Sequence, residues 1–245
     1  MNYSRKVALV TGASRGIGAA IVRRLAQDGF AVAINYVSRQ KQAQALADEL
    51  GKNGAVTCLV QGDVASDADV KRMFAQAEQE LGRVSVLVNN AGILKTTPVA
   101  QTSDELFEQT FGVNVRGVFN TLRLAATQLA EGGRIINLSS TALALNMPGY
   151  AVYNASKAAV ESLTRVFAKE LRGRSITVNA VAPGPVETEL FLEGKTAEQV
   201  QTFAKMPPLE RLGQPEDIAN VVAFLAGPDS AWVNGQVLRA NGGIA

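Results

Sequence analysis

Short apolar runs alternate with longer amphipathic stretches along the whole chain. The apolar runs, rich in β-branched and aliphatic residues, are Val7–Val10, Ala31–Tyr36, Ala55–Gln61, Val84–Asn89, Arg134–Leu138, Ile176–Ala182 and Gln236–Leu238. Helical periodicity covers about Gly16–Asp28, Arg39–Leu50, Asp67–Leu81, Asp104–Leu129, Tyr150–Leu171 and Glu216–Leu225. Nearly continuous apolar strands are typical of a sheet with helices on both faces. The pattern therefore predicts an α/β fold, a doubly wound parallel sheet of about seven strands.

One segment, residues 184–208, interrupts this alternation between the sixth predicted strand and the last predicted helix. It carries glycines and prolines around a short polar helix near Thr196–Lys205. A long insertion at the carboxyl end of a strand is where open α/β folds place a ligand lid. The alternative interpretation is a packed surface excursion. The apolar side chains in and near it either line a pocket or anchor the lid helix: Leu190, Phe191, Leu192, Phe203, Met147 and Leu143.

The composition excludes several kinds of site. The 245 residues contain no histidine, which rules out a Ser-His-Asp catalytic unit and a His-liganded zinc site, and no metal site is predicted. The single cysteine, Cys58, cannot form an intrachain disulfide. A catalytic proton must therefore move through tyrosine, lysine, a carboxylate, the thiol or water.

Charge and hydropathy give no sign of a nucleic-acid or membrane partner. Lys+Arg and Asp+Glu number 24 and 22, a net charge of +2, and the charges are interspersed. Residues 1–6 lack an apolar signal core and no apolar run of membrane-spanning length follows, so the cytoplasm is the expected compartment. No linker divides the chain, which predicts a single domain over residues 1–245. Trp232 is expected to pack near the last strand.

The first predicted strand leads directly into a glycine-rich loop, Thr11-Gly12-Ala13-Ser14-Arg15-Gly16-Ile17-Gly18, and a helix follows. Glycines permit a tight turn and close approach of the backbone to phosphate, and the helix N-terminus supplies free N–H groups and a positive dipole end. The spacing is not that of an ATP-binding P-loop. This strand–loop–helix context predicts a site for the pyrophosphate of a dinucleotide.

The end of the second predicted strand bears on which dinucleotide binds. Enzymes that use NAD generally carry an acidic residue here, and those that use NADP carry an arginine instead. This chain has the neutral Tyr36, followed closely by Ser38 and Arg39, and Arg15 in the glycine loop is a second candidate for the 2′-phosphate. The alternative is that both arginines are solvated surface charges. We expect NADP(H) to be preferred, with NAD(H) as a possible substitute.

Four further positions follow strands or share a helix face. Asp63, after the third strand, either accepts a hydrogen bond from the adenine or caps the next helix. Tyr153 and Lys157 lie four residues apart in a helical stretch, so they share one face. Because an ammonium favours a phenolate, the lysine is expected to lower the pKa of the tyrosine towards neutrality. Ser140 ends the fifth strand, where its hydroxyl can share the substrate oxygen with Tyr153.

The chain resembles the short-chain dehydrogenase/reductase family from Lys6 to Gly243. The motifs that carry the resemblance are Thr11–Gly18, Asn89-Asn90-Ala91-Gly92, Asn114, Ser140, the Tyr153/Lys157 pair and Pro183-Gly184. The resemblance implies a single Rossmann-type domain. It also implies a homotetramer, built through the long helices at Asp104–Leu129 and Tyr150–Leu171 and through the C-terminal strand.

The resemblance further implies a role for each matched residue. Tyr153 would be the general acid–base, Lys157 would bind the nicotinamide ribose, and Ser140, rather than its neighbour Ser139, would orient the carbonyl oxygen. Asn114 would hold a proton-relay water in a kinked helix, although a helix-satisfied amide is the structural alternative. The implied cofactor contacts are Asn90 at the adenine ribose, Gly92 beside the cofactor, Asp63-Val64 at the adenine, and Val186 and Thr188 at the nicotinamide amide.

These observations favour NADPH-dependent reduction of a ketone to a secondary alcohol. The body of the chain is similar to bacterial 3-oxoacyl-acyl-carrier-protein reductases, which resemble one another in a basic patch that docks the acidic carrier. Arg174 matches one of the two expected basic positions, but the other falls near Ala130-Glu131, which is neutral and then acidic. Residues 132–137, 232–236 and 240–243 look closer to trihydroxynaphthalene reductases, which reduce cyclic or aromatic ketones. We therefore expect a free small-molecule carbonyl substrate. A carrier-bound 3-oxoacyl chain is the alternative, and a non-catalytic NADPH sensor is a third hypothesis.

Overall fold

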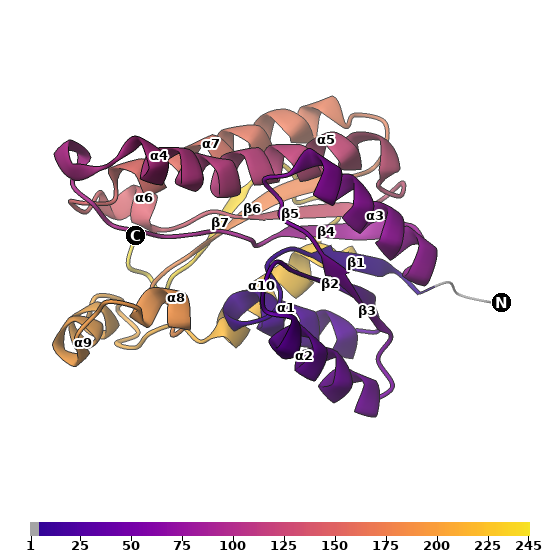
Figure 1. Ribbon diagram of the computed structural model, residues 1–245, viewed down its shortest axis with the longest axis horizontal. Coiled ribbons are helices and arrows are strands. Elements are labelled where there is room, and N and C mark those ends of the chain that lie inside the picture. Colours follow the sequence, from indigo (N-terminus) through magenta and orange to yellow (C-terminus); the bar gives the residue numbers. More distant parts are fainter. Residues whose placement is uncertain (1–4) are drawn as a thin grey trace.

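Seven parallel strands form one sheet in the computed structural model, which describes residues 5–245 (Figure 1). The order across the sheet is β3-β2-β1-β4-β5-β6-β7, which confirms the predicted doubly wound α/β fold. Residues 1–4, part of the segment searched for a signal sequence, lie outside the described residues. The strands are β1 (Val7–Val10), β2 (Ala31–Tyr36), β3 (Thr57–Gln61), β4 (Val84–Asn89), β5 (Arg134–Leu138), β6 (Thr177–Pro183) and β7 (Val237–Ala240).

Helices cover both faces of the sheet, as Figure 1 shows. On one face lie α1 (Gly16–Gln27), α2 (Gln40–Lys52) and α10 (Pro215–Ala226); on the other lie α3 (Asp67–Leu81), α5 (Gly117–Gln128) and α7 (Ala151–Glu170). Each face has its own apolar core, with Ile21 and Val222 in the first and Phe74 and Leu122 in the second. Among residues 5–245, no helix is both long and apolar enough to cross a membrane.

Burial along the strands follows their place in the sheet. Every residue of β1, β2 and β6 is buried, because these strands have neighbours on both sides and helices above and below. The edge strands β3 and β7 are partly exposed. Trp232, which precedes β7, has a fully exposed side chain, so the expectation that it packs near the last strand was wrong.

The helix predicted over Asp104–Leu129 is interrupted. It consists of α4 (Asp104–Phe111), a π-helical stretch η2 (Gly112–Arg116) and α5, with Asn114 inside the π-helical part. A π-helical turn accommodates an extra residue and is frequently found at functional sites. The local apolar periodicity predicted one continuous helix over this range, and it did not reveal the π-helical turn inside it.

The segment predicted as a lid leaves the sheet at the end of β6. It contains α8 (Glu189–Leu192) and α9 (Ala197–Lys205), and a capping box between Thr196 and Gln199 begins the second of these. Three further short helices are η1 (Val99–Gln101), α6 (Ala142–Leu145) and η3 (Pro228–Ser230). In Figure 1, α8 and α9 lie on the same side of the sheet as α1, and α6 lies across from them. The strand order reverses at β1, so ligands are expected at the carboxyl ends of β1 and β4, beneath this segment.

Candidate active site

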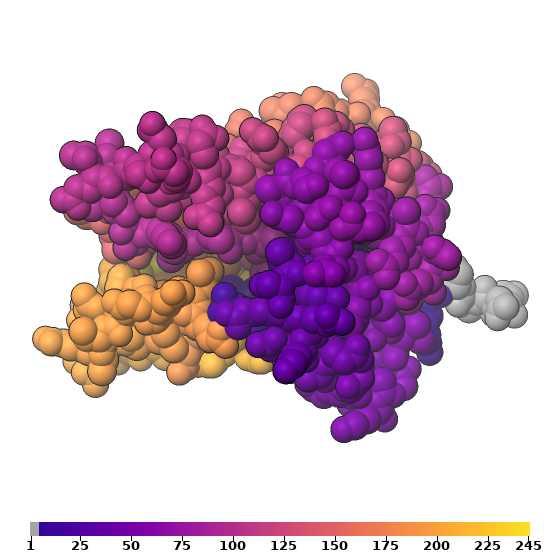
Figure 2. Space-filling model, in the orientation of Figure 1, coloured from indigo at the N-terminus to yellow at the C-terminus, as the bar shows by residue number. Residues whose placement is uncertain are grey.

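A cleft of about 520 Å³ opens at the carboxyl ends of the central strands. The glycine-rich loop and the ends of β2 and β4 line one part of it, and the end of β5, the start of α7 and the lid line the other. Figure 2 shows the surface hollowed between the orange lid residues and the magenta helices opposite. The volume falls in the range of small-molecule sites. Every residue to which the sequence analysis gave an individual catalytic or cofactor-binding role lines this cleft except Asn114.

Two glycines of the loop are required by close approach within the protein. A Cβ at Gly12, whose φ is +61°, would lie 2.8 Å from the Cα of Ala91, and one at Gly18 would lie 2.6 Å from the carbonyl oxygen of Gly12. Arg15 precedes α1, and its side chain does not cap the helix. The first N–H groups of α1 are therefore left to bind an anion in the cleft, which suits a pyrophosphate.

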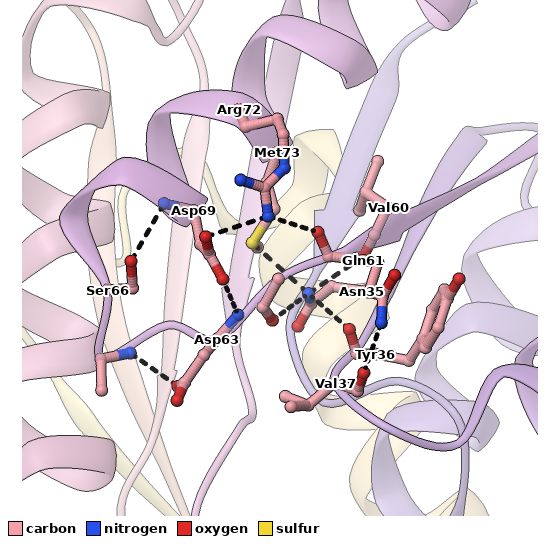
Figure 3. A network of polar contacts seen from close by, with 12 residues as sticks. Asn35, Tyr36, Val37, Val60, Gln61, Asp63, Ser66, Asp69, Arg72 and Met73 are labelled. Carbon is pink, nitrogen blue, oxygen red and sulfur yellow. Dashed lines mark hydrogen bonds and ion pairs between the residues drawn. The ribbon is translucent and has the colours of Figure 1, made fainter.

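Asn35, to which the sequence analysis assigned no role, holds the glycine-rich loop in place through a hydrogen bond with Gly12. This residue is 1% exposed; its Oδ1 accepts from the N–H of Gly12 at 3.0 Å. As Figure 3 shows, its Nδ2 donates to the carbonyls of Val60, at 3.1 Å, and Gly62, at 3.0 Å. One buried amide thus joins the phosphate loop to the end of β3. A lone polar residue in an otherwise apolar buried strand was the signal that could have identified it.

Asn90 and Thr11 join the loop to the end of β4. The Nδ2 of Asn90 donates to the carbonyls of Thr11 and Gly12, both at 2.9 Å. The Thr11 hydroxyl accepts in return from the N–H groups of Asn90 and Ala91, both at 3.0 Å. Asn90 therefore braces the loop, in addition to the contact with the adenine ribose that the resemblance implies.

Asp63 does not cap the helix that follows it. Ser66 does so, accepting from the N–H of Asp69 at 3.3 Å, while Asp63 accepts from the N–H of Ala65 at 2.9 Å (Figure 3). The Asp69 carboxylate in turn receives the N–H of Asp63 at 2.9 Å. Of the two roles left open by the sequence, capping is excluded, and Asp63 faces the cleft together with Val64.

The two arginines considered for the 2′-phosphate lie at the same end of the cleft. Arg15 from the loop and Arg39 from the segment after β2 both line it, as do Tyr36 and Ser38. Each guanidinium is 36% to 40% exposed and pairs with Glu189 of the lid. They are therefore not isolated surface charges. The residues present fit a dinucleotide with an additional phosphate, since the neutral Tyr36 stands where NAD enzymes carry an acid and two cations line the cleft with it.

At the other end of the cleft, two adjacent serines have different partners. The hydroxyl of Ser139 donates to Glu161 Oε1 at 2.7 Å and is engaged with α7. The hydroxyl of Ser140 accepts from the N–H of Ala142 at 3.2 Å and lines the cleft beside Tyr153. This geometry agrees with the choice of Ser140 over Ser139.

Tyr153 lies beside Ser140, and burial changes its titration in the direction opposite to the one expected. Desolvation by burial raises the pKa of Tyr153, and the Tyr150 hydroxyl raises it further, while hydrogen bonding with Ser140 lowers it. The expectation that the Lys157 ammonium draws this pKa towards neutrality was therefore wrong for the protein alone, because desolvation has the largest effect on the pKa of Tyr153. A neutral phenol at physiological pH is the form that can donate a proton.

Lys157 is buried one turn further along α7. Its Nζ donates to the carbonyl oxygen of Leu138 at 2.8 Å and lies 5.7 Å from the centre of the Tyr153 ring. Burial lowers the pKa of Lys157 to about 8. A cation is thus held against the Tyr153 ring and beside Gly92, where a Cβ would lie 3.5 Å from the ammonium nitrogen.

Asn114 is buried behind the cleft and holds its back wall together. Its Oδ1 accepts from the N–H of Ile93 at 2.9 Å, and its Nδ2 donates to the Ile93 carbonyl and to Ser156 Oγ, both at 3.0 Å. Ser156 in turn donates to the Tyr153 carbonyl at 2.7 Å. Both amide hydrogens are used off the helix, which excludes the helix-satisfied amide. The role of holding a proton-relay water, which the resemblance implies, stays a prediction. Asn114 positions the turn of α7 that carries the tyrosine.

The apolar lining differs in part from the expected set. Leu190, Phe191, Phe203 and Met147 line the cleft as expected, but Leu143 and Leu192 do not. Leu192 is instead among the exposed apolar residues. The sequence analysis missed several lining residues, among them Ile93, Leu94, Leu145 and Tyr150.

Comparison with known proteins gives matches over nearly the whole chain. A family model described as enoyl-(acyl carrier protein) reductase matches residues 12–245. A short-chain type dehydrogenase/reductase of Picea abies is 46% identical, over 97% of this chain and 92% of that protein. An NADPH-dependent aldehyde reductase-like chloroplastic protein of Arabidopsis thaliana is 44% identical, over 97% and 93%.

Two further matches bear on the subgroup and the fold. A hydroxynaphthalene reductase-like protein of Metarhizium majus is 41% identical, over 97% of this chain and 94% of that protein. The structure of a blue fluorescent protein from a metagenomic library, in complex with NADPH, superposes with a TM-score of 0.93 at 42% identity and covers 100% of both chains. The resemblance seen in the motifs is thus confirmed: the chain is an oxidoreductase that belongs to the short-chain dehydrogenase/reductase family.

Proposed function

We propose that this protein reduces a free, small-molecule ketone to a secondary alcohol with NADPH. The observation that carries the proposal is the convergence of Tyr153, Ser140 and Lys157 at one end of a cleft whose other end carries Arg15 and Arg39. Proton donor, oxyanion donor and buried cation stand at the apolar end, and the phosphate-binding groups stand at the opposite end. This division suits an extended dinucleotide with a carbonyl compound at its reactive end.

The chain's own residues provide the acid–base part of the reaction. Tyr153 donates its phenolic proton to the carbonyl oxygen as negative charge develops there, and Ser140 donates a hydrogen bond to the same oxygen. The Lys157 ammonium stabilises the tyrosinate that remains. Bound NADPH would supply the hydride that reduces the carbonyl carbon. Asn114 acts indirectly, by holding Ser156 and the turn that carries Tyr153.

Preference for NADPH follows from the charges at the adenosine end. Tyr36 leaves the end of β2 without a carboxylate to repel a 2′-phosphate, and the guanidinium groups of Arg15 and Arg39 can bond one. Two of the similar proteins support the same cofactor: one relative is described as NADPH-dependent, and one solved structure is a complex with NADPH.

The apolar end favours a cyclic or aromatic substrate. The Tyr150 ring packs edge-to-face on Tyr153 with 6.3 Å between centres, and Phe191 packs in the same manner on Phe203 with 5.3 Å. All four rings line the cleft. Aromatic walls of this kind offer stacking and edge contacts to a flat ring. The hydroxynaphthalene reductase-like relative is consistent with such a substrate.

A carrier-bound 3-oxoacyl substrate is less well supported, because the one matching basic residue is occupied. Arg174 Nε pairs with Glu131 at 2.7 Å, while its two Nη atoms donate to the carbonyls of Ala126 and Leu129 at 2.5 and 2.7 Å. The guanidinium caps the end of α5, and Glu131 neutralises its charge. An acidic carrier therefore finds no free cation at this position.

The test is NADPH oxidation by the purified protein against a panel of carbonyl compounds. The panel holds an acetoacetyl carrier protein, its free thioester analogue, a cyclic diketone, a quinone, an aryl ketone and the matching aryl aldehyde. We expect the cyclic and aryl ketones to give the highest kcat/KM. A strong preference for the carrier-bound substrate would favour the 3-oxoacyl reductase instead. Binding of NADPH without turnover of any compound would favour a non-catalytic sensor.

We also propose that the protein assembles as a homotetramer, as its resemblance implied. A second, apolar groove of about 600 Å³ lies between α4–α5 and α7, where Phe119 and Val166 are about half exposed. Glu108 and Arg116 line the same groove on either side of Gly112. Two-fold pairing about Gly112 would bring each glutamate opposite the arginine of the second copy.

Phe119→Asp is expected to break this assembly, because it puts a charge in the centre of the apolar groove. Light scattering should show a tetramer for the wild type and a smaller species for the variant. Val56→Asp, a matched change at an exposed apolar residue outside the groove, should leave the mass unchanged. A wild-type monomer would contradict the proposal.

A further inference from the structure

One carboxylate joins the lid to the dinucleotide side of the cleft. Glu189, the first residue of α8, accepts on its Oε2 from Arg15 and from Arg39, the second at 3.4 Å. These residues lie 174 and 150 positions apart along the chain. Figure 2 shows the orange lid surface meeting the indigo surface of the N-terminal region. The same arginines are the ones proposed to bind the 2′-phosphate of NADPH.

A carboxylate and a phosphate compete for a guanidinium, because both are anions whose oxygens accept hydrogen bonds from its N–H groups. The hydrogen bond from Arg15 and its charge lower the pKa of Glu189, so this side chain is ionised at neutral pH. Glu189 therefore presents a full negative charge where the second anion must bind.

We propose that Glu189 is a specificity-determining residue: it competes with the dinucleotide 2′-phosphate for Arg15 and Arg39, and arrival of that phosphate releases α8. The inference rests on the proposed use of NADPH. NAD(H) carries a hydroxyl at this position, has no second anion to offer the arginines and leaves the Glu189 ion pairs intact. The energetic cost of breaking them thus falls on NADPH alone.

Release of α8 would also change the substrate end of the cleft, because the two residues that follow Glu189 line that end. Leu190 and Phe191 follow Glu189 in α8, and Phe191 packs on Phe203 of α9. Lys195 reinforces this unit, since its Nζ donates to the Phe191 carbonyl at 2.6 Å and lies 4.6 Å from the ring centre. Displacing Glu189 therefore moves an aromatic wall as one body. The occupant of the phosphate site acts in this way on the shape of the carbonyl site.

The test is calorimetric binding of NADP⁺, NAD⁺ and adenosine 2′,5′-bisphosphate to the full chain. Glu189→Gln removes the charge and keeps the shape. Because two exposed ion pairs contribute modestly, we expect NADP⁺ and the bisphosphate to bind about 3- to 10-fold more tightly. NAD⁺ affinity should change less than about 2-fold. Glu187→Gln is the matched control, since Glu187 pairs with Gln214 rather than with either arginine, and it should change none of the three.

Two further measurements separate the steps. In an Arg39→Ala background, Glu189→Gln should give a smaller gain, because residues that share one interaction are not additive. Hydrogen exchange across residues 189–205 should be faster in Glu189→Gln than in the wild type without ligand, and NADP⁺ should abolish the difference.

Several results would overturn the inference. Weaker NADP⁺ binding by Glu189→Gln would mean that the carboxylate orients the arginines instead of competing. An equal gain in NAD⁺ affinity in Glu189→Gln would mean that Glu189 repels the pyrophosphate, which both dinucleotides carry, and not the 2′-phosphate. A wild-type protein that binds NADP⁺ no more tightly than NAD⁺ would contradict the proposed cofactor, whereas unchanged bisphosphate affinity in Glu189→Gln would contradict only the competition.

Discussion

Tyr153→Phe is expected to lower kcat by about 10²- to 10⁴-fold, the usual contribution of a positioned acid–base group. The change removes only the phenolic O–H, which is the proton donor, and leaves the ring that packs edge-to-face on Tyr150. Ser140 cannot replace it, since a hydroxyl without an adjacent base or cation is a poor acid. Steady-state kinetics with the best ketone of the panel gives the measurement.

The loss should fall on turnover and not on cofactor binding. The NADP⁺ dissociation constant should stay within a few-fold of the wild type, because the arginines and the phosphate loop are untouched. Tyr150→Phe, the matched removal of a hydroxyl one turn earlier on the same wall, should reduce kcat far less. If Tyr153→Phe kept wild-type turnover, the assignment of the proton donor would be wrong.

The sequence predicted the sheet well because its interior strands are defined by local composition. β1 is apolar throughout, and β2 and β6 are mostly apolar, with Asn35, Thr177 and Asn179 as their polar residues. Such strands are expected to be covered on both faces, and every residue in all three is buried. The glycine loop could also be recognised from the sequence, because a tight turn between a strand and a helix favours glycine locally. Strand composition and turn residues are read from neighbours in the chain, whereas the close approach of Ala91 to Gly12 is not.

The features that the sequence did not reveal depend on partners far away in the chain. Asn35 matters because the N–H of Gly12, 23 residues earlier, needs an acceptor. Asn114 matters because Ile93 and Ser156, 21 and 42 positions away, meet its amide. Glu189 pairs across 174 and 150 residues. No local periodicity encodes such contacts, so the site residues were found and their connections were not.

The pKa of Tyr153 is raised and not lowered, which shows that local sequence also does not predict electrostatic effects that depend on burial. The four-residue spacing correctly placed a lysine beside the tyrosine, but spacing carries no measure of burial. The burial that raises the pKa of Tyr153 also lowers that of Lys157, because desolvation disfavours both charged forms. A neutral phenol next to a cation that titrates near neutrality is suited to donating a proton in the reductive direction.

This pairing leads to a pH dependence that can be measured. Reduction requires Lys157 as an ammonium and Tyr153 as a neutral phenol. The pKa of Lys157 is about 8, so its charged fraction falls as pH rises through that value, whereas Tyr153 stays protonated to a higher pH. The kcat/KM for NADPH, which reports groups of the free enzyme, should therefore decline above pH 8.

Substitutions at Lys157 separate its charge from its bulk. Lys157→Met fills the same buried space without the charge, and kcat/KM should fall by about 10²- to 10³-fold at neutral pH, as for loss of a preorganised electrostatic group. The decline above pH 8 should vanish with it, because no group remains to titrate there. Lys157→Arg keeps a cation at all accessible pH values, so its decline should move upward. A Lys157→Met variant with the wild-type alkaline decline would show that another group titrates, and that the buried ammonium does not set the alkaline limit.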